Sequence, residues 1–402
     1  MHVIVLGAGV VGTTTAYYLS QLGCRVTVVD RASDVGDGAS FANAGQLSYS
    51  FTDALAKPEF VATIPRLLLG RDPGTRVRLT PGLMGWGLRF LGQCTARRAE
   101  HNTITVLKTA MRSAELMTEL RQRAPFEFSH RRAGKLVLLS DEAELKAATA
   151  RSRLKNAHGS DTRILSRDEV TTIEPALEHV TDEFIAAVYS QNDEVADSLK
   201  FTTGLRKWLE EDGLVTFRLS STSKRIVAKR GRAHAVVVDD DTIEADAVIV
   251  CMGAWSQRLL RTVGINPHIY PMRGYSITLP PGEASPSVSV TVLKHRIVFS
   301  NIDGLIRIAG FADFTGFDTS ADTERTRSLL ELARRVAPDA ASYDSGDIRA
   351  WGGFRPMTPS GQPLVGETRI RGLFLNTGHG MLGWTLACAT GYEAAQAVVR
   401  SH

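Results

Sequence analysis

The stretch Val3-Ile4-Val5-Leu6-Gly7-Ala8-Gly9-Val10-Val11-Gly12 decides the fold of this 402-residue chain. Its first part, residues 3–6, is a continuous apolar run, which is typical of a strand buried on both faces. The pattern Gly-x-Gly-x-x-Gly follows directly and opens an apolar helix that we expect to reach residue 22, with Gly23 as its C-cap. A second β-branched strand, residues 26–29, leads to Asp30. The order strand, glycine turn, helix and strand predicts a dinucleotide-binding βαβ unit.

Each glycine of this pattern has a separate physical role. Gly7 permits the tight turn after the strand, Gly9 lets the backbone approach a pyrophosphate, and Gly12 lets helix and strand pack closely. The N–H groups at the helix start favour phosphate oxygens, and Asp30 can accept hydrogen bonds from ribose hydroxyls while repelling a 2′-phosphate. The motif therefore leaves FAD and NAD open and disfavours NADP. Val10, Val11 and Arg31 flank these residues and are expected cofactor contacts as well.

The rest of the chain alternates between two kinds of pattern. Strand and helix patterns of the α/β kind recur at residues 198–219, 245–251 and 373–399, whereas residues 275–309 look more antiparallel. We therefore predict an α/β protein with one Rossmann-like nucleotide-binding domain assembled from separated segments, residues 1–85, 190–265 and 350–402. Residues 86–189 and 266–349 are expected to form an α+β substrate domain with a mostly antiparallel sheet.

Composition places the chain among ordinary folded proteins. Apolar residues make up 43% and charged residues 22%, with a formal charge of +4. These figures exclude a disordered, collagen-like or coiled-coil chain. Because the positive excess is small and no Lys/Arg cluster accompanies it, nothing favours nucleic acid as a partner.

Cysteine spacing and the length of apolar runs exclude further classes. The four cysteines lie far apart without a Cys-x-x-Cys pair, which argues against a zinc site or a disulfide scaffold, so no metal is expected. No stretch approaches the roughly 20 apolar residues that cross a bilayer, and the first residues lack the regions of a signal peptide. We therefore expect a cytoplasmic protein, at most peripheral at the inner face of the cytoplasmic membrane.

Three later stretches narrow the choice of cofactor. Residues 245–256 form an apolar strand that breaks into a turn at Gly253, followed by Trp255. In Gly353-Phe354-Arg355-Pro356 an arginine stands beside a run of turn-forming residues. Residues 376–385, Asn-Thr-Gly-His-Gly-Met-Leu-Gly-Trp-Thr, form a glycine-rich loop that leads into a helix. A second helix N-terminus of this kind suits an anionic or carbonyl-bearing part of a cofactor.

Together with the first motif, these stretches resemble the FAD-dependent D-amino-acid oxidase superfamily, and within it the bacterial D-amino-acid dehydrogenases of the small-subunit type. Residues 38–48, Gly-Ala-Ser-Phe-Ala-Asn-Ala-Gly-Gln-Leu-Ser, resemble the segment of that subgroup that lies along the flavin. The resemblance implies a FAD-binding domain of the glutathione-reductase type. It also implies non-covalent FAD, because the cysteine that covalent relatives use is missing between Arg355 and Gly383.

The resemblance further implies roles for single residues. Arg355 falls on the arginine that grips the substrate carboxylate, a task that suits a planar guanidinium with two parallel donors. Tyr275 is its expected partner, and Tyr270 and His379 are further catalytic candidates, although His379 between glycines is better suited to shape the loop. The expected cofactor contacts beyond the first motif are Ser40, Ala44, Gly45, Gln46, Leu47, Gly253, Trp255, Gly378, His379, Gly380, Gly383, Trp384 and Thr385.

The implied reaction is the FAD-dependent oxidative deamination of a D-amino acid. A hydride passes from Cα to flavin N5, and the imino acid product hydrolyses to a 2-oxo acid and ammonia. Cyclic substrates such as D-proline or cis-4-hydroxy-D-proline fit this reaction, and a quinone or another respiratory carrier is the expected electron acceptor.

Alternatives stay open at this point. The acceptor could be oxygen, the substrate could be of the sarcosine or glycine kind, and the chain could be the flavin subunit of a hetero-oligomer. A non-catalytic flavin-fold assembly protein would have no reason to keep Arg355 and Tyr275, and an NAD-dependent reductase would leave residues 378–385 unexplained. Residues 60–93 mix apolar and basic side chains, which fits a helix packed in the second domain or a surface that contacts a membrane or a partner subunit.

Overall fold

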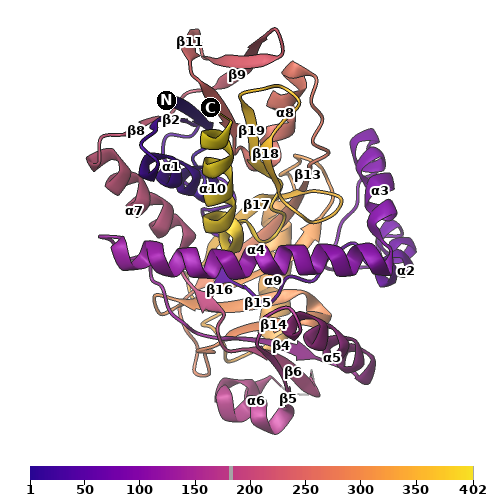
Figure 1. The fold of residues 1–402 in the computed structure, drawn as a ribbon. Coiled ribbons are helices and arrows are strands. Elements are labelled where there is room, and N and C mark those ends of the chain that lie inside the picture. Colours follow the sequence, from indigo (N-terminus) through magenta and orange to yellow (C-terminus); the bar gives the residue numbers. More distant parts are fainter. Residues whose placement is uncertain (181–183, 402) are drawn as a thin grey trace.

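The computed structural model describes residues 1–180 and 184–401, and these residues form two large sheets in different halves of the molecule (Figure 1). The first sheet has the strand order β18-β19-β12-β1-β2-β8, in which every neighbouring pair except β18 and β19 is parallel. β12 is buried at each residue, as its continuous apolar sequence predicts. The strands are β1 (His2–Leu6), β2 (Arg25–Val29), β8 (Val215–Arg218), β12 (Ala247–Val250), β18 (Leu364–Glu367) and β19 (Leu373–Thr377).

The first sheet is the middle one of three layers. Alternate residues of a strand point to opposite faces, so Val3 and Val5 pack against helices while Ile4 and Leu6 pack against a small β-meander. The helical layer consists of α1 (Val10–Gln21), α4 (Ala96–Arg123), α7 (Ser198–Glu211) and α10 (Gly383–Arg400). The meander consists of β9 (Ser223–Lys229), β10 (Arg232–Val238) and β11 (Asp241–Glu244), with α8 (Ser256–Leu260) beside it.

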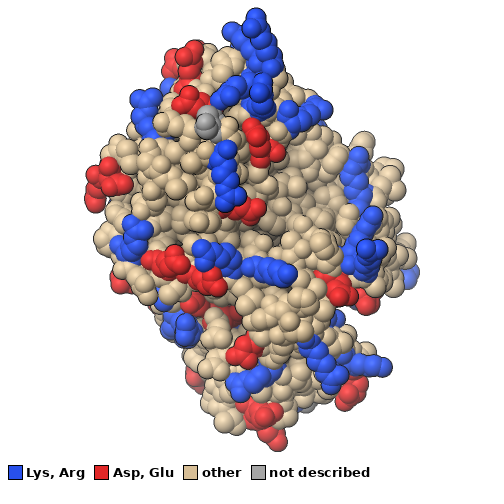
Figure 2. All heavy atoms as spheres, viewed as in Figure 1, with Lys and Arg blue, Asp and Glu red and all other residues tan. Residues whose placement is uncertain are grey.

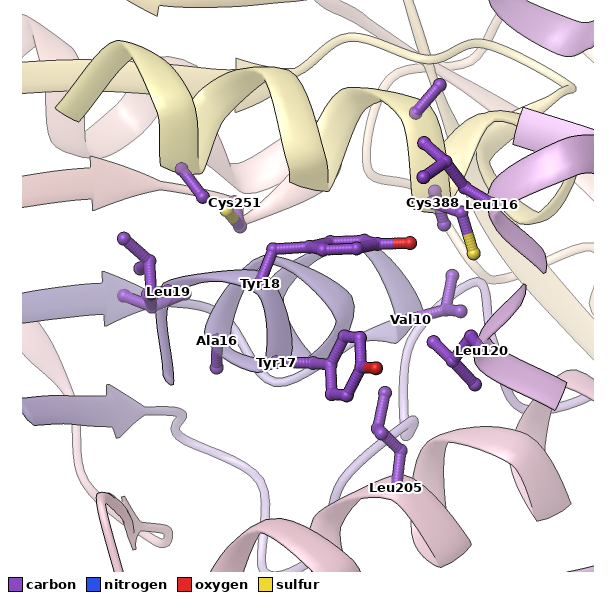
Figure 3. Close-up of a cluster of buried hydrophobic side chains, with 14 of the residues drawn as sticks. Val10, Ala16, Tyr17, Tyr18, Leu19, Leu116, Leu120, Leu205, Cys251 and Cys388 are labelled. Atoms are coloured by element: carbon purple, nitrogen blue, oxygen red, sulfur yellow. The ribbon is translucent and has the colours of Figure 1, made fainter. Parts of the chain in front are cut away.

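Figure 3 shows the centre of the helical layer. Tyr17 and Tyr18 of α1 pack among Leu120 of α4, Leu205 of α7 and Cys388 of α10. The two tyrosine rings meet edge to face with centroids 5.0 Å apart, an arrangement that aromatic pairs prefer. The same core therefore holds α1 and α10, whose first turns both reach the cavity described below.

The second sheet has the order β17-β13-β16-β15-β14-β4-β6-β5 and is antiparallel except between β14 and β4. One face packs on α9 (Asp322–Val336) and α6 (Arg167–Ile173). Its strands are β4 (Lys135–Leu139), β5 (Thr162–Ser166), β6 (Ala186–Ser190), β13 (Tyr270–Leu279), β14 (Ser289–Val292), β15 (Ile297–Ile302), β16 (Leu305–Asp313) and β17 (Arg349–Met357). The mostly antiparallel second sheet agrees with the sequence prediction.

Two elements lie on the other side of the predicted domain boundaries. Residues 350–402 were expected to belong to the domain of the first sheet. β17, at the beginning of this segment, instead pairs with β13 of the second sheet along its whole length. α4, expected in the substrate domain, contributes Val106, Ala110 and Leu120 to the helical layer. Both differences arise from long-range packing that local patterns do not report. The division into two domains remains our proposal, and residues 181–183 and 402, which fall within the predicted ranges, lie outside the described residues.

The remaining helices line or flank the space between the sheets. α5 (Glu142–Asn156) packs beside β4 and β6, while α2 (Pro58–Leu68) and α3 (Pro81–Gln93) project at one side of the molecule (Figure 1). A short strand pair, β3 (Gln46–Leu47) and β7 (Glu194–Val195), crosses between the sheets. Within the described ranges, no helix is both long and apolar enough to cross a membrane.

Candidate active site

A cavity of about 1430 Å³ lies between the first sheet, the second sheet and helices α2 and α5. Its walls include the glycine turn after β1, the loop before α10 and residues of β4, β13 and β17. This volume exceeds the roughly 300–1,000 Å³ of a typical small-molecule site. The cavity therefore has room for a dinucleotide together with a small substrate.

The glycine turn closes one end of this cavity. Gly7 has a φ of +108°, and its N–H donates to the Val29 carbonyl at 2.8 Å. A Cβ on Gly12 would lie 1.8 Å from the Gly7 carbonyl oxygen, so the helix approaches the strand only because residue 12 has no side chain. Gly9 is the N-cap of α1, and the Val10 N–H donates to Ser40 Oγ at 3.0 Å. The start of α1 thus presents backbone N–H groups at the cavity, as pyrophosphate binding requires.

Asp30 and Arg31 lie on the cavity wall directly after β2. The Asp30 carboxylate accepts hydrogen bonds from the Ala8 N–H at 2.7 Å and from the Ala32 N–H at 2.9 Å. These bonds hold the carboxylate beside the glycine turn, and each oxygen keeps acceptor capacity for a ribose hydroxyl. The Arg31 guanidinium lies over the Trp255 ring at 4.0 Å, so two segments predicted to flank the cofactor are in contact.

The segment from residue 38 to 48 runs along the cavity from α1 toward the second sheet. Asn43 Nδ2 donates to Ser198 Oγ at 2.8 Å, and Ser198 Oγ donates to the Ser40 carbonyl at 2.7 Å. Gly45 adopts a φ of +68° and its N–H donates to Asn43 Oδ1 at 2.9 Å. Hydrogen bonds to α7 and within the segment therefore fix its course along the site.

The glycine-rich loop before α10 forms another edge of the cavity. His379 is buried between Gly378 and Gly380, which have φ values of +80° and +56°. The Thr390 hydroxyl donates to the Leu386 carbonyl, so its oxygen accepts the Nε2–H of His379 at 3.0 Å. Burial lowers the pKa of His379 to about 3. The imidazole is therefore neutral at neutral pH, which fits a loop-shaping role better than proton transfer.

Arg355 extends from β17 into the cavity across the neighbouring strand β13. Its Nη1 donates to the Phe311 carbonyl at 2.8 Å, and a Cβ on Gly274 would lie 2.4 Å from its Cζ. Glycine at position 274 thus lets the guanidinium lie flat over the strand. Burial lowers the pKa of Arg355 to about 10, while the charge of Asp313 opposes that shift. The group stays cationic at neutral pH, and its hydrogen bond in the described chain goes to a neutral carbonyl.

Asp313 is a buried carboxylate behind this wall, next to the cavity-lining Tyr275. It accepts hydrogen bonds from Tyr275 Oη at 2.9 Å and from Arg325 Nη2 at 2.8 Å, and both ends of the ion pair are buried. Burial and the nearby Asp313 charge raise the pKa of Tyr275 well above its usual value, so its hydroxyl stays protonated and donates to Asp313. Asp313 is therefore committed to Arg325, and Arg355 adds a second positive charge to the same wall.

The structure brings most of the predicted site residues to this one cavity. The predicted residues that line it are Gly7, Gly9, Val10, Val11, Asp30, Arg31, Ser40, Ala44, Gly45, Gln46, Gly253, Trp255, Tyr275, Arg355, His379, Gly380, Gly383 and Trp384. Gly12, Leu47, Gly378 and Thr385 lie behind the wall. Among these, Thr385 Oγ1 accepts a hydrogen bond from the Ser48 N–H at 3.0 Å and so ties α10 to the segment along the cavity.

Tyr270, the second tyrosine candidate, is not brought to the cavity wall. Its ring packs with Trp86 and Phe314, at centroid distances of 5.8 and 6.1 Å. Tyr270 and Tyr275 both lie on β13, but a bulge between Arg273 and Tyr275 changes the pairing of that strand with β16. The position of Tyr270 gives it a packing role in the structure.

Three residues in or directly behind the cavity wall were not predicted from the sequence. Gly274 could have been found, since a glycine inside a strand often marks the close approach of another group. Asp313 follows an unremarkable strand, and nothing local indicates that it meets Tyr275 and Arg325. Lys135 opens the strand Lys-Leu-Val-Leu-Leu, where a terminal lysine is expected to face solvent, yet it is 2% exposed.

Comparison with protein families decides the assignment of this site. A family model described as FAD dependent oxidoreductase, DAO, matches residues 2–397. The chain belongs to this family. The cofactor of this oxidoreductase is therefore FAD, which decides between the two cofactors, FAD and NAD, that the first glycine motif left open.

Relatives of the FAD-dependent oxidoreductase match over nearly its whole length. The D-amino acid dehydrogenase of Dechloromonas aromatica (strain RCB) is 38% identical over 410 residues, which cover 99% of this chain and 97% of the relative. The D-amino acid dehydrogenase of Vibrio vulnificus (strain YJ016) is 33% identical over 402 residues, which cover 99% and 96%. The resemblance predicted from the motifs is confirmed.

Solved structures share the fold of this oxidoreductase. The L-proline dehydrogenase from P. horikoshii superposes with a TM-score of 0.77 at 20% identity, covering 99% of this chain and 93% of the other. The glycine oxidase from Bacillus cereus ATCC 14579 superposes with a TM-score of 0.75 at 20% identity, covering 100% and 95%. At such identities the likeness concerns the fold alone, and it confirms the predicted fold class.

The residues of the cavity fit FAD. Gly9 and the start of α1 would hold the pyrophosphate, because this helix N-terminus lines the cavity and Gly9 has no side chain to keep a phosphate away from the backbone. Gly7 makes the tight turn that brings the helix to this position. Asp30 would hold the adenosine ribose. Gly380 and Gly383, at the start of α10, would face the polar edge of the flavin ring, to which helix N–H groups are suited.

Proposed function

We propose that this oxidoreductase oxidises D-amino acids at Cα and passes the electrons to a quinone. The relatives named D-amino acid dehydrogenase, at 33–38% identity over the full chain, support the substrate class. The single structural observation that carries the proposal is Arg355, a cavity-lining guanidinium without a carboxylate partner in the described chain. The carboxylate of an amino acid would supply the missing counter-charge.

The charges around Arg355 argue for an anionic substrate. Of the two guanidinium groups near Asp313, Arg325 is bonded to it and is turned away into the protein, whereas Arg355 faces the cavity. This wall of the cavity therefore carries a net positive charge. A carboxylate bound there gains charge-assisted hydrogen bonds of about 1.5–3 kcal/mol each.

The chain has little acid–base work to do in this reaction. Bound FAD supplies the hydride acceptor, so the protein must fix the carboxylate, exclude water and hold Cα in place. Arg355 fixes the carboxylate, and Gly274 beneath it keeps the guanidinium flat. His379 is neutral but buried in its loop, and Tyr275 is protonated, so neither of these predicted catalytic residues acts as a general base. Because no such base removes a proton from the substrate ammonium group, a substrate with a neutral amine reacts best.

The proposal is tested by anaerobic reduction of the purified holoenzyme with D- and L-amino acids. The set includes D-alanine, D-proline, both 4-hydroxyproline epimers, glycine and sarcosine, and bleaching of the flavin absorbance is followed directly. We expect bleaching by D-isomers and loss of bleaching in Arg355→Ala with FAD retained. Bleaching by glycine or sarcosine alone would replace the substrate class, and the absence of bleaching by every compound would overturn the proposal.

FAD is held without a covalent bond in this proposal. Cys251 is the cysteine on the cavity wall, and it contacts Thr15 at 3.9 Å. Burial raises the pKa of Cys251 to about 12, which keeps it a thiol and a poor nucleophile. Denaturation with acid should therefore release all of the flavin into the supernatant, and flavin retained by the precipitate would contradict the proposal.

The quinone part of the proposal rests on an exposed surface of α2 and α3, which we call the apolar ridge. Its members Leu68, Leu69, Leu79, Met84 and Leu88 are 53–72% exposed. Lys and Arg side chains gather over the same region (Figure 2), and Arg66 and Arg89 belong to the two helices. Apolar groups with neighbouring cations suit the surface of an anionic membrane, where quinones reside. The enzyme then lies at the inner face of the cytoplasmic membrane.

Flotation with phosphatidylglycerol vesicles tests the ridge. We expect the wild-type protein to float and the double variant Leu69→Asp/Leu88→Asp to stay in solution, with unchanged dye-coupled activity. Leu214→Asp, an exposed leucine after α7, is the matched control and should float. In parallel, a short-chain ubiquinone should reoxidise the reduced flavin faster than dissolved oxygen does. Faster reoxidation by oxygen would make the protein an oxidase.

A further inference from the structure

Lys135 is a buried cation that faces the cavity from the second sheet. On β4 the residues alternate, so Leu136 and Leu138 enter the hydrophobic core behind the sheet while Lys135, Val137 and Leu139 line the cavity. The side chain of Lys135 is on a strand far from β17 in the sheet order. The cavity therefore has a cationic group on a wall other than the one that carries Arg355.

The partners of this ammonium are neutral. Lys135 Nζ donates to Gln46 Oε1 at 2.8 Å and to Ser48 Oγ at 2.9 Å, and it lies over the Phe51 ring at 4.3 Å. An ammonium has three donors, so one more acceptor can be bound. Burial lowers the pKa of Lys135 to about 8 while Asp193 opposes the shift, which leaves the group mostly protonated at neutral pH. A buried charge of this kind is costly unless an opposite charge joins it.

Two carboxylates lie nearby, and neither forms an ion pair with Lys135 in the described part of the chain. Asp53 pairs with Lys155 at 3.2 Å and with Arg151 at 3.6 Å. Asp193 Oδ1 accepts the Ser50 N–H at 3.2 Å, whereas its buried Oδ2 has no hydrogen-bond partner in the described residues. Burial raises the pKa of Asp193, while the charge of Lys135 opposes this shift. The three cations Lys135, Arg151 and Lys155 thus face two carboxylates. Because Lys135, Arg151 and Lys155 all line the cavity, the excess positive charge is open to a ligand.

The location of Lys135 connects this charge to the substrate. Gln46 and Ser48, which accept its hydrogen bonds, belong to the segment that runs along the cofactor part of the cavity. Ser48 is in turn bonded to Thr385 at the start of α10. The ammonium therefore lies next to the residues that border the reaction site, and a substrate side chain can reach it while the α-carboxylate stays on Arg355.

We infer that Lys135 binds a second carboxylate, on the side chain of the substrate, and that the enzyme prefers acidic D-amino acids of the aspartate and glutamate kind. This inference rests on the proposed oxidation of D-amino acids and deepens it to a substrate class. Lys135 is a specificity residue here and takes no part in the transfer of hydrogen.

The test compares isosteric acids and amides. With the holoenzyme, kcat/KM is measured for D-glutamate against D-glutamine and for D-aspartate against D-asparagine. We expect a preference for the acid of at least about 10-fold, since a charge-assisted hydrogen bond is lost in the amide. In Lys135→Met the preference should fall about 10-fold or more, and Lys135→Arg should restore part of it. Lys200→Met, which removes an exposed lysine paired with Asp303 outside the cavity, is the charge-matched control and should keep the preference.

A binding experiment on the wild-type protein makes the test independent of any variant. Glutarate should perturb the flavin absorption spectrum at a concentration at least about 10-fold lower than 4-carbamoylbutyrate, its monoamide, which keeps one carboxylate and replaces the other by a neutral amide. Equal affinities would overturn the inference. Equal loss of kcat/KM for acids and amides in Lys135→Met would also overturn it, because Lys135 would then act on every substrate. If D-amides and D-alanine reduce the flavin without an acid preference, the inference alone fails, whereas no reduction by any D-amino acid overturns the proposed function as well.

Discussion

The two sides of the cavity are built from different chemistry. On the first-sheet side, the wall consists of backbone groups and glycines, and its carboxylate, Asp30, is bonded to backbone N–H groups. On the second-sheet side, the wall presents the buried charged side chains of Arg355 and Lys135, and the pair of Asp313 and Arg325 lies behind it. A substitution should therefore act through steric exclusion on the first side and through uncompensated charge on the second.

Gly12→Ala tests the first side and should have the largest effect. The new Cβ would lie 1.8 Å from a backbone oxygen that cannot move aside cheaply, so α1 must shift away from β1. We expect a loss of more than about 3 kcal/mol in unfolding free energy and a purified protein without bound FAD, measured by flavin absorbance and urea denaturation. Gly85→Ala on α3, where a Cβ meets nothing within 4 Å, is the control and should keep the flavin. A yellow Gly12→Ala protein of normal stability would contradict the steric argument.

Arg325→Met and Arg355→Met test the second side as a pair. Removing Arg325 leaves Asp313 buried without its cationic partner, which should cost about 3–5 kcal/mol of unfolding free energy. Removing Arg355 breaks no ion pair in the described chain and should change the unfolding free energy by less than about 1 kcal/mol, although activity is lost.

Urea denaturation of the FAD-saturated proteins, followed by circular dichroism, measures both effects. Arg325→Lys should recover part of the stability, since it restores a cation beside Asp313. Similar losses of unfolding free energy in the two methionine variants would contradict the prediction that Arg325 stabilises the fold whereas Arg355 serves substrate binding.

His379 gives a smaller effect that depends on pH. Burial lowers its folded-state pKa from 6.5 to about 3, so the unfolded chain binds a proton more readily between those values. The stability that the neutral imidazole contributes is therefore complete above pH 6.5 and is lost as the pH falls toward 3. At pH 5 the loss amounts to about 2 kcal/mol.

The measurement is the urea midpoint of wild type and His379→Gln at pH 7.5 and at pH 5. Gln keeps a donor near Thr390 but does not titrate, so the variant should lose about 2 kcal/mol less than the wild type on acidification. Parallel losses in the two proteins would mean that His379 is protonated in the folded state at pH 5.

The contrast between the first-sheet side and the second-sheet side of the cavity also explains which features could be predicted from the sequence. The glycine turn, Asp30 and the loop at residues 376–385 depend on local backbone geometry, which a short motif specifies. Arg355 was found through its motif. By contrast, the pairing of β17 with β13, the packing of α4 on α10 and the hydrogen bond from Tyr275 to Asp313 join residues far apart in the chain. No local pattern encodes such contacts, and for the same reason the buried position of Lys135 could not be foreseen.

Tyr275→Phe and Tyr270→Phe give the smallest and most discriminating comparison, because both residues lie on β13 but only Tyr275 reaches the cavity. Loss of the Tyr275 hydroxyl frees one oxygen of Asp313, which can then draw the Arg355 guanidinium away from the substrate. We expect kcat/KM to fall about 10-fold, the equivalent of one hydrogen bond to a charged group. Most of this fall should come from a higher KM, since the chemistry itself needs no tyrosine proton.

Tyr270→Phe is the control. It keeps the aromatic packing with Trp86 and Phe314, so its kcat/KM should stay within about twofold of wild type. A larger loss of kcat/KM in Tyr270→Phe than in Tyr275→Phe would contradict this assignment, because Tyr270 and not Tyr275 would then contribute to substrate binding.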